Sequence, residues 1–254
     1  MQHLFSSPGL AALAEALRHT PLLAFDFDGT LAPIAPRPDA VHVAPAIGWR
    51  LSRLAARMPV AIITGRRVED ARARLGIDGL DIIGNHGAQD VDDPSGCARH
   101  ARALDSLRAL LADAAAALDA AQVFVEDKEQ SIALHYRLAR NRQAAAELAW
   151  RLCLDAAPAV RSFGGKEVVN AIGAQAPDKA DAVHALARRH GTTHVIFAGD
   201  DVNDEPVFVS APPTWLTIRI GRDDPASKAR YYLGAQGEME ALLHRMLEAS
   251  GSGP

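Results

Sequence analysis

The chain has 254 residues, of which 48% are hydrophobic and 23% charged, a composition typical of a globular protein rather than a disordered one. Its formal net charge of −4, with acidic and basic residues interspersed, provides no basic stripe for a nucleic acid or an anionic membrane. The two cysteines, Cys97 and Cys153, have no CxxC spacing, which argues against a disulfide framework or a zinc site and predicts a cytosolic protein.

The N-terminal segment is predicted to form a packing helix rather than a targeting signal. Its apolar residues follow helical spacing, with Ser7 as the expected N-cap and Pro8 in the first turn. Glu15 and Arg18 interrupt the only hydrophobic stretch, which is too short for a signal peptide. No segment approaches the ~20 consecutive apolar residues that a membrane span requires, so no membrane partner is expected.

Strands and helices alternate in the first third of the chain, and the last third resumes the same order. The first third contains predicted strands at 22–27, 60–64 and 81–84 and helices at 45–58 and 67–75. The last third contains a predicted helix at 178–190 and strands at 193–199 and 214–221. Because these strands are continuously apolar, we predict an α/β protein with a Rossmann-like, doubly wound parallel sheet covered on both faces.

The pattern changes in the middle of the chain, where an α-β-β unit is predicted twice in succession. The expected elements are helices at 99–121 and 141–157 and strands at 123–128, 131–137, 159–163 and 166–172, the last two joined across Gly164 and Gly165. Parallel sheets need crossover connections rather than hairpins. We therefore predict an inserted α+β domain with a four-stranded antiparallel sheet, and a division into core 1–90, inserted domain 91–171 and core 172–254.

One face of the predicted antiparallel sheet collects polar side chains, because strand residues alternate between the two faces. The residues on this face are Glu126, Lys128, His135, Arg137, Lys166 and Asn170. The opposite face is apolar and can pack on the two predicted helices. A binding surface and an ordinary solvent-exposed face explain this alternation equally well.

Carboxylates follow two of the predicted core strands. Asp26 and Asp28 end the first strand, and ligands of open α/β sheets bind at the carboxyl ends of strands. A turn-forming Asx residue explains one of them but not the pair. A second acidic cluster follows the strand VIFAG and consists of Asp200, Asp201, Asp204 and Glu205.

Convergence of the two strand ends would bring Asp26, Asp28 and Asp200 together. A hard cation makes such a cluster tolerable, and Mg²⁺ is predicted because it prefers a few oxygen ligands. For Asp204 and Glu205, a solvated helix N-terminus capped by Asn203 or Asp204 is the competing interpretation.

Hydroxyl and basic groups complement these acids. Thr64 ends the second core strand and is followed by Gly65 and Arg66, whose amides and guanidinium suit an anion. Lys179 lies early in the helix that returns to the core. Each signal is weak alone, since Thr-Gly turns and surface lysines are common, but together the four residues predict a phosphate-binding set.

The combined set has the chemistry of a phosphatase. Asp26 is the predicted nucleophile, since a carboxylate can form an aspartyl phosphate. Asp28 is predicted to protonate the leaving alcohol and then to deprotonate the attacking water. Mg²⁺, Thr64 and Lys179 would stabilise the charge on the transferring phosphoryl group.

Four motifs resemble those of the haloacid dehalogenase-like (HAD) phosphohydrolases. They are DFDGTL from Asp26, TGR from Thr64, the lysine at 179 and GDDVND from Gly199, in that order. The inserted domain is similar to the family's larger α-β-β cap. Within the family, the stretches NHGA, VEDKEQSIALHYR, GGKEVVNA and GDDVNDE look most like those of trehalose-6-phosphate phosphatases.

The resemblance implies a Mg²⁺-dependent enzyme that hydrolyses trehalose 6-phosphate to trehalose and phosphate in trehalose biosynthesis. It implies that Asp26, Asp200 and the backbone carbonyl of Asp28 hold Mg²⁺, with Asp201 and Asp204 behind them. It also implies that cap residues recognise this small-molecule sugar phosphate, namely Glu126, Lys128, Arg137, Lys166 and Asn170.

Four positions depart from the family pattern; those at Ala180 and Asn203 are benign, and the one at Asn170 leaves alternatives for the substrate open. Asn170 replaces the usual Glu, Gln89 another Glu, Ala180 a Gly and Asn203 a Thr. The change at Asn170 turns a carboxylate for sugar hydroxyls into an amide. The alternatives are a phosphatase for sucrose phosphate or mannosyl-3-phosphoglycerate, a sugar phosphomutase with the same cap, and a non-catalytic sugar-phosphate sensor.

Overall fold

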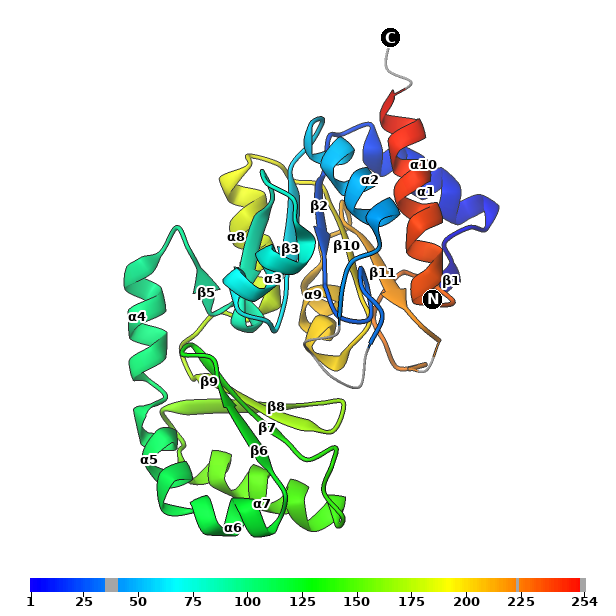
Figure 1. Ribbon diagram of the computed structural model, residues 1–254. Helices are drawn as coiled ribbons and strands as arrows, with labels where there is room; N and C mark the ends of the chain where they lie inside the picture. Colours follow the sequence, from blue (N-terminus) through cyan, green and yellow to red (C-terminus); the bar gives the residue numbers. More distant parts are fainter. Residues whose placement is uncertain (35–40, 223, 252–254) are drawn as a thin grey trace. The chain divides into compact units, whose positions relative to one another are not determined.

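The computed structural model describes residues 1–34, 41–222 and 224–251 (Figure 1). Contacts between residues divide the chain into two units. The first comprises Met1–Thr64, Glu69–Ile83 and Lys179–Pro254, and the second Gly65–Val68 and Gly84–Asp178. The inserted domain predicted over 91–171 lies inside the second unit, which also includes chain segments on both sides of it.

The first unit is built on a parallel sheet, as predicted. Its strands are β1 (Gln2–His3), β2 (Leu22–Phe25), β3 (Val60–Ile63), β4 (Asp81–Gly84), β10 (Val195–Gly199), β11 (Leu216–Ile220) and β12 (Tyr231–Leu233). They lie in the order β1-β12-β11-β10-β2-β3-β4, and their pairings are parallel. The order reverses at β2, with β3 on one side and β10 on the other. Such a switch point is where doubly wound sheets bind ligands.

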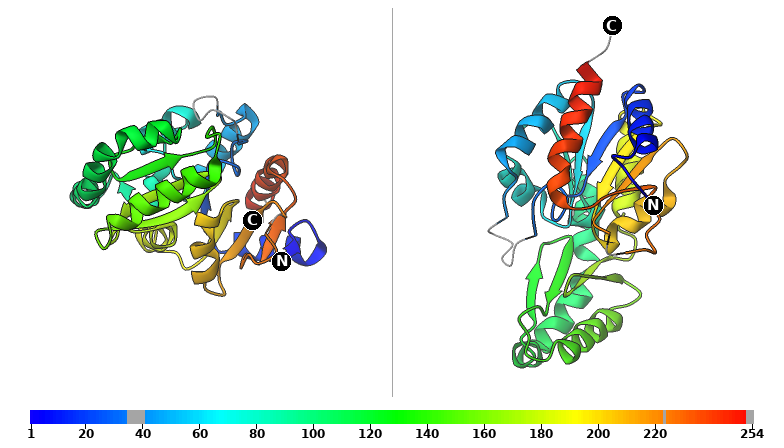
Figure 2. Two further views of the ribbon diagram at one scale, coloured as in Figure 1. Left: turned by 90° about the horizontal axis from the view of Figure 1, so that it is seen from below. Right: turned by 90° about the vertical axis from the view of Figure 1, so that its right-hand side faces the viewer.

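Helices cover both faces of this sheet. On one face, α8 (Lys179–Arg189) and α9 (Glu205–Ser210) pack against side chains of β2, β3 and β10. The other face carries α1 (Ser7–Leu17), α2 (Pro45–Ala55), α3 (Val68–Leu75) and α10 (Met239–Gly251), with α10 beside α2 (Figures 1 and 2). All four residues of β2 are buried as a result, which explains its continuously apolar sequence.

The N-terminal helix is capped one residue earlier than predicted. The side chain of Ser6, not Ser7, accepts a hydrogen bond from the amide of Gly9, at 3.4 Å. Ser6 has the extended backbone that an N-cap requires. None of the helices in the described ranges has the length and apolar composition needed to cross a bilayer.

The second unit is a four-stranded antiparallel sheet with helices on one face, as predicted. Its sheet order is β6-β7-β9-β8, with strands β6 (Phe124–Asp127), β7 (Ser131–His135), β8 (Val160–Gly165) and β9 (Val168–Gly173). The helices are α4 (Pro94–Arg102), α5 (Asp105–Asp113), α6 (Ala115–Ala120) and α7 (Arg142–Asp155). A short strand, β5 (Gln89–Asp90), precedes them.

The single helix predicted over 99–121 is wrong, because α4, α5 and α6 replace it. One straight helix of that length would span roughly 35 Å, well beyond strands of about 20 Å. The breaks let Leu107, Leu111 and Leu118 all reach the same apolar core, where they meet α7 and the sheet.

Two predicted strand boundaries also differ. β8 continues through Gly164 and Gly165, so Lys166 and Glu167 form the turn to β9, and Glu167 takes a left-handed φ of +60°. β7 ends at His135, which leaves Arg137 outside the strand. The face parity nevertheless holds, since Glu126, Ala133 and Asn170 lie opposite one another across three strands.

Candidate active site

The predicted catalytic residues of the first unit follow three neighbouring strands. β10, β2 and β3 lie side by side, and Asp200, Asp26 and Thr64 come directly after them. All three side chains are buried, and Thr64 is held at the strand end because its amide donates to the carbonyl of Ile83, at 2.9 Å. Asp28 is half-buried in the tight loop after Asp26.

Lys179 lies at the centre of a buried ion cluster. Its Nζ is 2.6 Å from Oδ1 of Asp26 and 2.7 Å from Oδ1 of Asp204. Lys179 is 2% exposed and Asp204 is fully buried, so bulk solvent does little to screen these charges. Groups from the first and last parts of the chain therefore depend on each other for electrostatic compensation.

Burial and neighbouring charges shift the pKa values of Asp26 and Lys179 in this cluster. Burial raises the pKa of Asp26 well above its ordinary value, and the negative charges of Asp204 and Asp200 act in the same direction, whereas Lys179 opposes them. For Lys179, burial acts to lower the pKa, but the charges of Asp204 and Asp26 outweigh it and hold the pKa above its ordinary value. The lysine consequently stays a cation.

Asp204 serves as a partner for this lysine rather than as a solvated helix cap. Its Oδ1 accepts from Lys179, and its Oδ2 accepts from the amide of Asp201, at 2.9 Å. Asp201 supplies the cap, since its carboxylate accepts from the amide of Val202, at 2.8 Å. The solvated-cap interpretation is thus wrong for Asp204, whose side chain is inaccessible.

Glycines allow the acidic groups to come this close. Gly29 has a φ of +91°, and a Cβ there would lie 2.2 Å from Oδ2 of Asp200. A Cβ on Gly199 would lie 2.4 Å from the carboxyl carbon of Asp204. The DGT turn therefore needs glycine for its backbone conformation and for the approach of Asp200.

The carboxylates form a group suited to a divalent cation. One ligand oxygen from each of Asp26, Asp200 and Asp204 lies within 4.8 Å of the others. When all three carboxylates are ionised and Lys179 is protonated, two negative charges remain in a buried place, and a bound divalent cation would offset them and favour the ionised form of Asp26. The oxygens of Asp204 accept from Lys179 and from the amide of Asp201, so Asp204 serves the lysine. Asp26 and Asp200, which directly follow their strands, stay the predicted ligands for a hard cation.

Gly65 and Arg66, predicted to bind phosphate, belong to the second unit through their contacts. A Cβ on Gly65 would lie 2.3 Å from the imidazole of His86, so only glycine allows this approach. The carbonyl of Arg66 accepts from the amide of Asn85, at 2.8 Å. This short segment is therefore attached to the residues that follow β4.

The open face of the antiparallel sheet carries a second polar group. His135 Nε2 lies 3.0 Å and Lys128 Nζ 3.5 Å from Oε2 of Glu126. The hydrogen bond with His135 lowers the pKa of Glu126, and the charge of Lys128 acts in the same direction. Glu126 is thus held as an anion on the face that carries Asn170.

The remaining predicted cap residues divide between the turn and the sheet. Arg137 donates to the carbonyl of Lys166, at 3.1 Å, and its Nε lies 3.4 Å from Glu167, so both predicted basic residues lie at the β8–β9 turn. Asn170 is 5% exposed, between Ala133 of β7 and Phe163 of β8 in the register. The described contacts do not join Arg137 to Glu126 or Asn170.

Two residues of the sites were not singled out from the sequence. The hydroxyl of Thr30 donates to Oδ1 of Asp200, at 3.4 Å, and Thr30 is fully buried. Asn85 is also fully buried, and its side chain bonds to several chain segments. The signals in the sequence are the threonine within DFDGTL and the asparagine of NHGA, each of which is part of a motif without a predicted role of its own.

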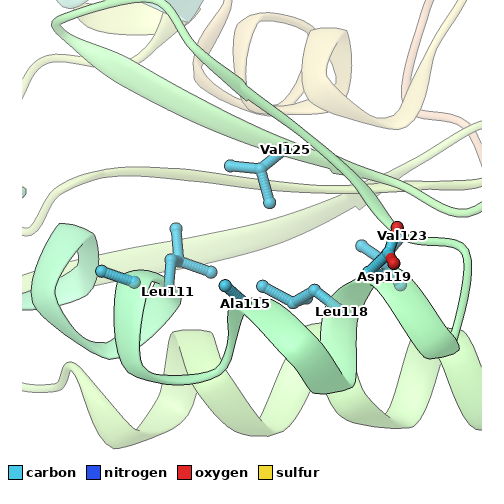
Figure 3. Close-up of a pocket in the computed structure, with 7 residues that line it drawn as sticks. Leu111, Ala115, Leu118, Asp119, Val123 and Val125 are labelled. Carbon is cyan, nitrogen blue, oxygen red and sulfur yellow. The ribbon is translucent and has the colours of Figure 1, made fainter.

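An apolar depression on the second unit is a poor place for a phosphate. It lies between α5, α6 and β6 (Figure 3). Its lining residues are Leu111, Ala112, Ala115, Leu118, Asp119, Val123 and Val125. It contains one carboxylate and no cationic side chain, so it would repel rather than bind an anion.

The chain matches a protein-family model. The match covers residues 24–232, and the family is described as Trehalose-phosphatase. This range includes the carboxylate cluster, all of the second unit and most of the first unit. The resemblance to trehalose-6-phosphate phosphatases, drawn from the stretches NHGA, VEDKEQSIALHYR, GGKEVVNA and GDDVNDE, is thereby confirmed.

Individual relatives agree with this match. A probable trehalose-phosphate phosphatase of Sinorhizobium fredii is 36% identical over 241 residues, which are 92% of this chain and 88% of the relative. The solved structure of the C. albicans trehalose-6-phosphate phosphatase C-terminal domain superposes on this chain with a TM-score of 0.73 at 17% identity. The superposition covers 95% of this chain and 96% of the C. albicans domain. This second likeness supports the fold.

The match with some other curated relatives covers only a small part of their length. An uncharacterized glycosyl hydrolase of Mycobacterium tuberculosis is 34% identical over 215 residues, which are 80% of this chain but only 16% of that protein. The shared region is therefore a module that also occurs within a much longer chain.

Proposed function

The chain belongs to the trehalose-phosphatase family of HAD phosphohydrolases, and we propose that it hydrolyses trehalose 6-phosphate to trehalose and phosphate with the help of Mg²⁺. One observation carries the proposal: the buried cluster of Asp26, Lys179 and Asp204 beside Asp200, at the carboxyl ends of neighbouring strands. This cluster combines a nucleophile, a fixed cation and ligands for a divalent metal.

The reaction proceeds in two displacements at phosphorus. A carboxylate oxygen of Asp26 forms a bond to phosphorus while the bond to the 6-oxygen of the sugar breaks, and Asp28 donates a proton to that oxygen. A water then attacks the aspartyl phosphate, Asp28 accepts its proton, and the bond between Asp26 and phosphorus breaks. Asp28 is suited to this exchange because it is half-buried and in reach of water.

Lys179 and Thr64 stabilise the phosphoryl oxygens in this proposal. Lys179 keeps its proton throughout, since Asp204 and Asp26 hold its pKa above its ordinary value. Asp26 and Asp200 would hold Mg²⁺, which when bound supplies positive charge to the phosphoryl group. Recognition of the sugar by Glu126, Lys128, Arg137, Lys166 and Asn170 and location in the cytosol stay predictions.

Phosphate release from trehalose 6-phosphate tests the proposed reaction. The isosteric variant Asp26→Asn should lose turnover by at least about 1,000-fold, because an amide is not a nucleophile here. Asp113→Asn, which changes an exposed aspartate of α5, should match the wild type. EDTA should abolish turnover and added Mg²⁺ restore it. Turnover that persists in Asp26→Asn or in EDTA would disprove this mechanism.

A panel of sugar phosphates tests the proposed substrate. We expect the highest kcat/KM for trehalose 6-phosphate, above sucrose phosphate, mannosyl-3-phosphoglycerate and glucose 6-phosphate. The variant Asn170→Glu restores the carboxylate usual in the family, so its effect on KM reports whether this position contacts the sugar. A better substrate than trehalose 6-phosphate would keep the phosphatase assignment and change the sugar.

A further inference from the structure

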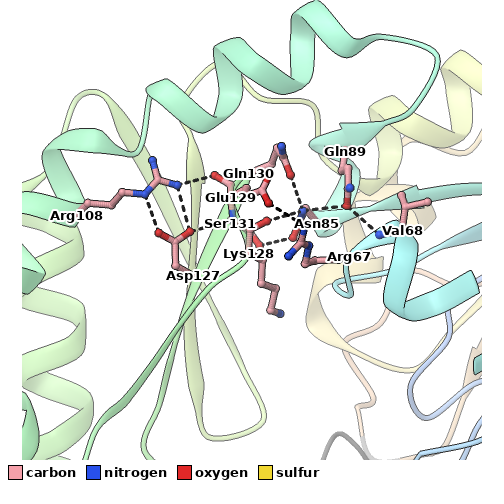
Figure 4. A network of polar contacts seen from close by, with 10 residues as sticks. All are labelled: Arg67, Val68, Asn85, Gln89, Arg108, Asp127, Lys128, Glu129, Gln130 and Ser131. Carbon is pink, nitrogen blue, oxygen red and sulfur yellow. Dashed lines mark hydrogen bonds and ion pairs between the residues drawn. The ribbon is translucent and has the colours of Figure 1, made fainter. Parts of the chain in front are cut away.

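Asn85, the first residue of the short 3-10 helix η2 (Asn85–Gly87), has an unusually large number of side-chain hydrogen bonds. Its Nδ2 lies 3.1 Å from Oε1 of Gln89, 3.2 Å from the carbonyl of Lys128 and 3.0 Å from Oε1 of Gln130, and its Oδ1 accepts from Ser131, at 2.7 Å (Figure 4). Asn85 is fully buried, with a φ of +51°. We call these five residues the Asn85 network.

An asparagine is specifically suited to this place. Three acceptor oxygens surround its NH₂ group and one hydroxyl donor faces its Oδ1, so both ends of the amide are used. Asparagine also tolerates the left-handed backbone better than larger residues do. The adjoining His86 and Gly87 have φ values of +60° and +114°, and such a strained run persists only where its surroundings fix it.

The Asn85 network and the neighbouring Glu129 hold the segment Gly65–Val68, one residue after another. Lys128 Nζ donates to the carbonyl of Gly65, at 3.1 Å, and the backbone amide of Asn85 donates to the carbonyl of Arg66. The guanidinium of Arg67 forms an ion pair with Glu129, with Nη2 2.8 Å from Oε1. The amide of Val68 donates to Oε1 of Gln89, at 2.9 Å, the same oxygen that Asn85 contacts.

The β6–β7 turn is itself a firm support for this segment. Arg108 of α5 donates to both carboxylate oxygens of Asp127, at 2.7 and 3.1 Å, and to the carbonyl of Glu129, at 2.7 Å (Figure 4). The hydrogen bond from Arg108 lowers the pKa of Asp127, so this pair stays ionised near neutral pH. The turn is thus tied to the helical layer of its own unit.

We propose that Asn85 is a positioning residue that fastens the segment after Thr64 to the β6–β7 turn. Gly65 and Arg66 then take their positions from residues 128–131 as well as from the strand that precedes them. The inference rests on the proposed function, because it assigns the network to the placement of predicted phosphate-binding residues. Gln89 keeps the acceptor that a glutamate would supply, so this departure from the family pattern preserves the bond to Val68.

Amide hydrogen exchange of the full chain tests the fastening without any need for activity. Asn85→Asp is isosteric but retains at most one donor toward three acceptor oxygens. Peptides covering 65–68 and 128–131 should exchange about 10-fold faster or more, whereas peptides of β2 and β10 should not change. Gln143→Ala, which removes a side-chain hydrogen bond on α7, should leave segment 65–68 as in the wild type. Unchanged exchange in Asn85→Asp would overturn the proposal.

A second pair of variants decides the question if Asn85→Asp does not fold. Gln89→Met removes the acceptor at similar side-chain volume, and Gln89→Glu retains an acceptor oxygen. Exchange at Val68 should accelerate by about 10-fold in Gln89→Met and by much less in Gln89→Glu. Equal exchange in the two variants would overturn the role of this acceptor.

Kinetics then separate positioning from sugar recognition. If the network positions phosphate-binding residues, Asn85→Asp should lower kcat about 10- to 100-fold for trehalose 6-phosphate and by a similar factor for a small aryl phosphate. It should also weaken inhibition by inorganic phosphate. An unchanged kcat together with faster exchange would overturn the positioning role. An inactive wild type would instead overturn the proposed function, and the exchange data would still decide the fastening.

Discussion

The two units bury their polar groups in different ways. In the first, Lys179 brings a full charge between Asp26 and Asp204, where all three side chains are almost inaccessible. In the second, Asn85 is as deeply buried but joins its neighbours through neutral hydrogen bonds. A buried ion cluster is a weak source of stability compared with apolar packing. Its presence therefore indicates chemistry, whereas the neutral network indicates the holding of a chain segment.

The largest effect should come from removing the central charge of the cluster. Lys179→Met leaves Asp26 and Asp204 buried without their cation, which should lower the free energy of unfolding by about 3–5 kcal/mol. Lys228→Met, at an exposed position, should change it by less than about 0.5 kcal/mol. Urea unfolding of both variants measures the difference. Equal unfolding free energies would show that the cluster is compensated in another way.

Glycine substitutions compare the close approaches of the two units. Gly29→Ala adds backbone strain of about 1–2 kcal/mol to a steric overlap worth about 1–3 kcal/mol. Gly65→Ala adds only the overlap with His86, so its loss of stability should be smaller. Gly237→Ala has open space around its new Cβ and serves as the control. Thermal unfolding should rank the variants in this order, and a Gly29→Ala protein as stable as the control would contradict the argument.

The sequence predicted the first unit better than the second for a physical reason. Apolar runs and the motif positions of Asp26, Thr64 and Asp200 are local signals, and parallel strands place their carboxyl ends at one edge. Asp204 looked like a helix cap, because its burial depends on Lys179, 25 residues away in sequence. A local pattern does not carry such a pairing.

The second unit depends more on contacts between segments. Asn85 bonds to a turn more than 40 residues later, and nothing in the letters NHGA shows that pairing. The breaks between α4, α5 and α6 have neither proline nor glycine at the joints and follow from the size of the sheet beneath them. By contrast, strand parity depends only on alternation, and it placed Glu126 and Asn170 correctly on one face.

The smallest predicted effect concerns the partly exposed ion group of the second unit. His135 and Lys128 lower the pKa of Glu126 below its value in the unfolded chain, so Glu126 binds fewer protons in the native state than in the unfolded state. The resulting stability is present above about pH 4.5 and is lost as the pH falls through the native pKa. Because the Glu126 side chain is 40% exposed, solvent screening limits the contribution to less than about 1 kcal/mol.

Glu126→Gln should therefore lower the free energy of unfolding slightly at pH 7 and weaken its decline below pH 4.5. Glu147→Gln, at an exposed position of α7 in the same unit, is the matched control. Urea unfolding between pH 3 and pH 7 measures both curves against the wild type. If Glu126→Gln and the control give the same pH dependence, the group on the open face contributes no charge-dependent stability. In that case the buried charges around Lys179 would cost free energy when unpaired, whereas the charges around Glu126 would have no effect on stability.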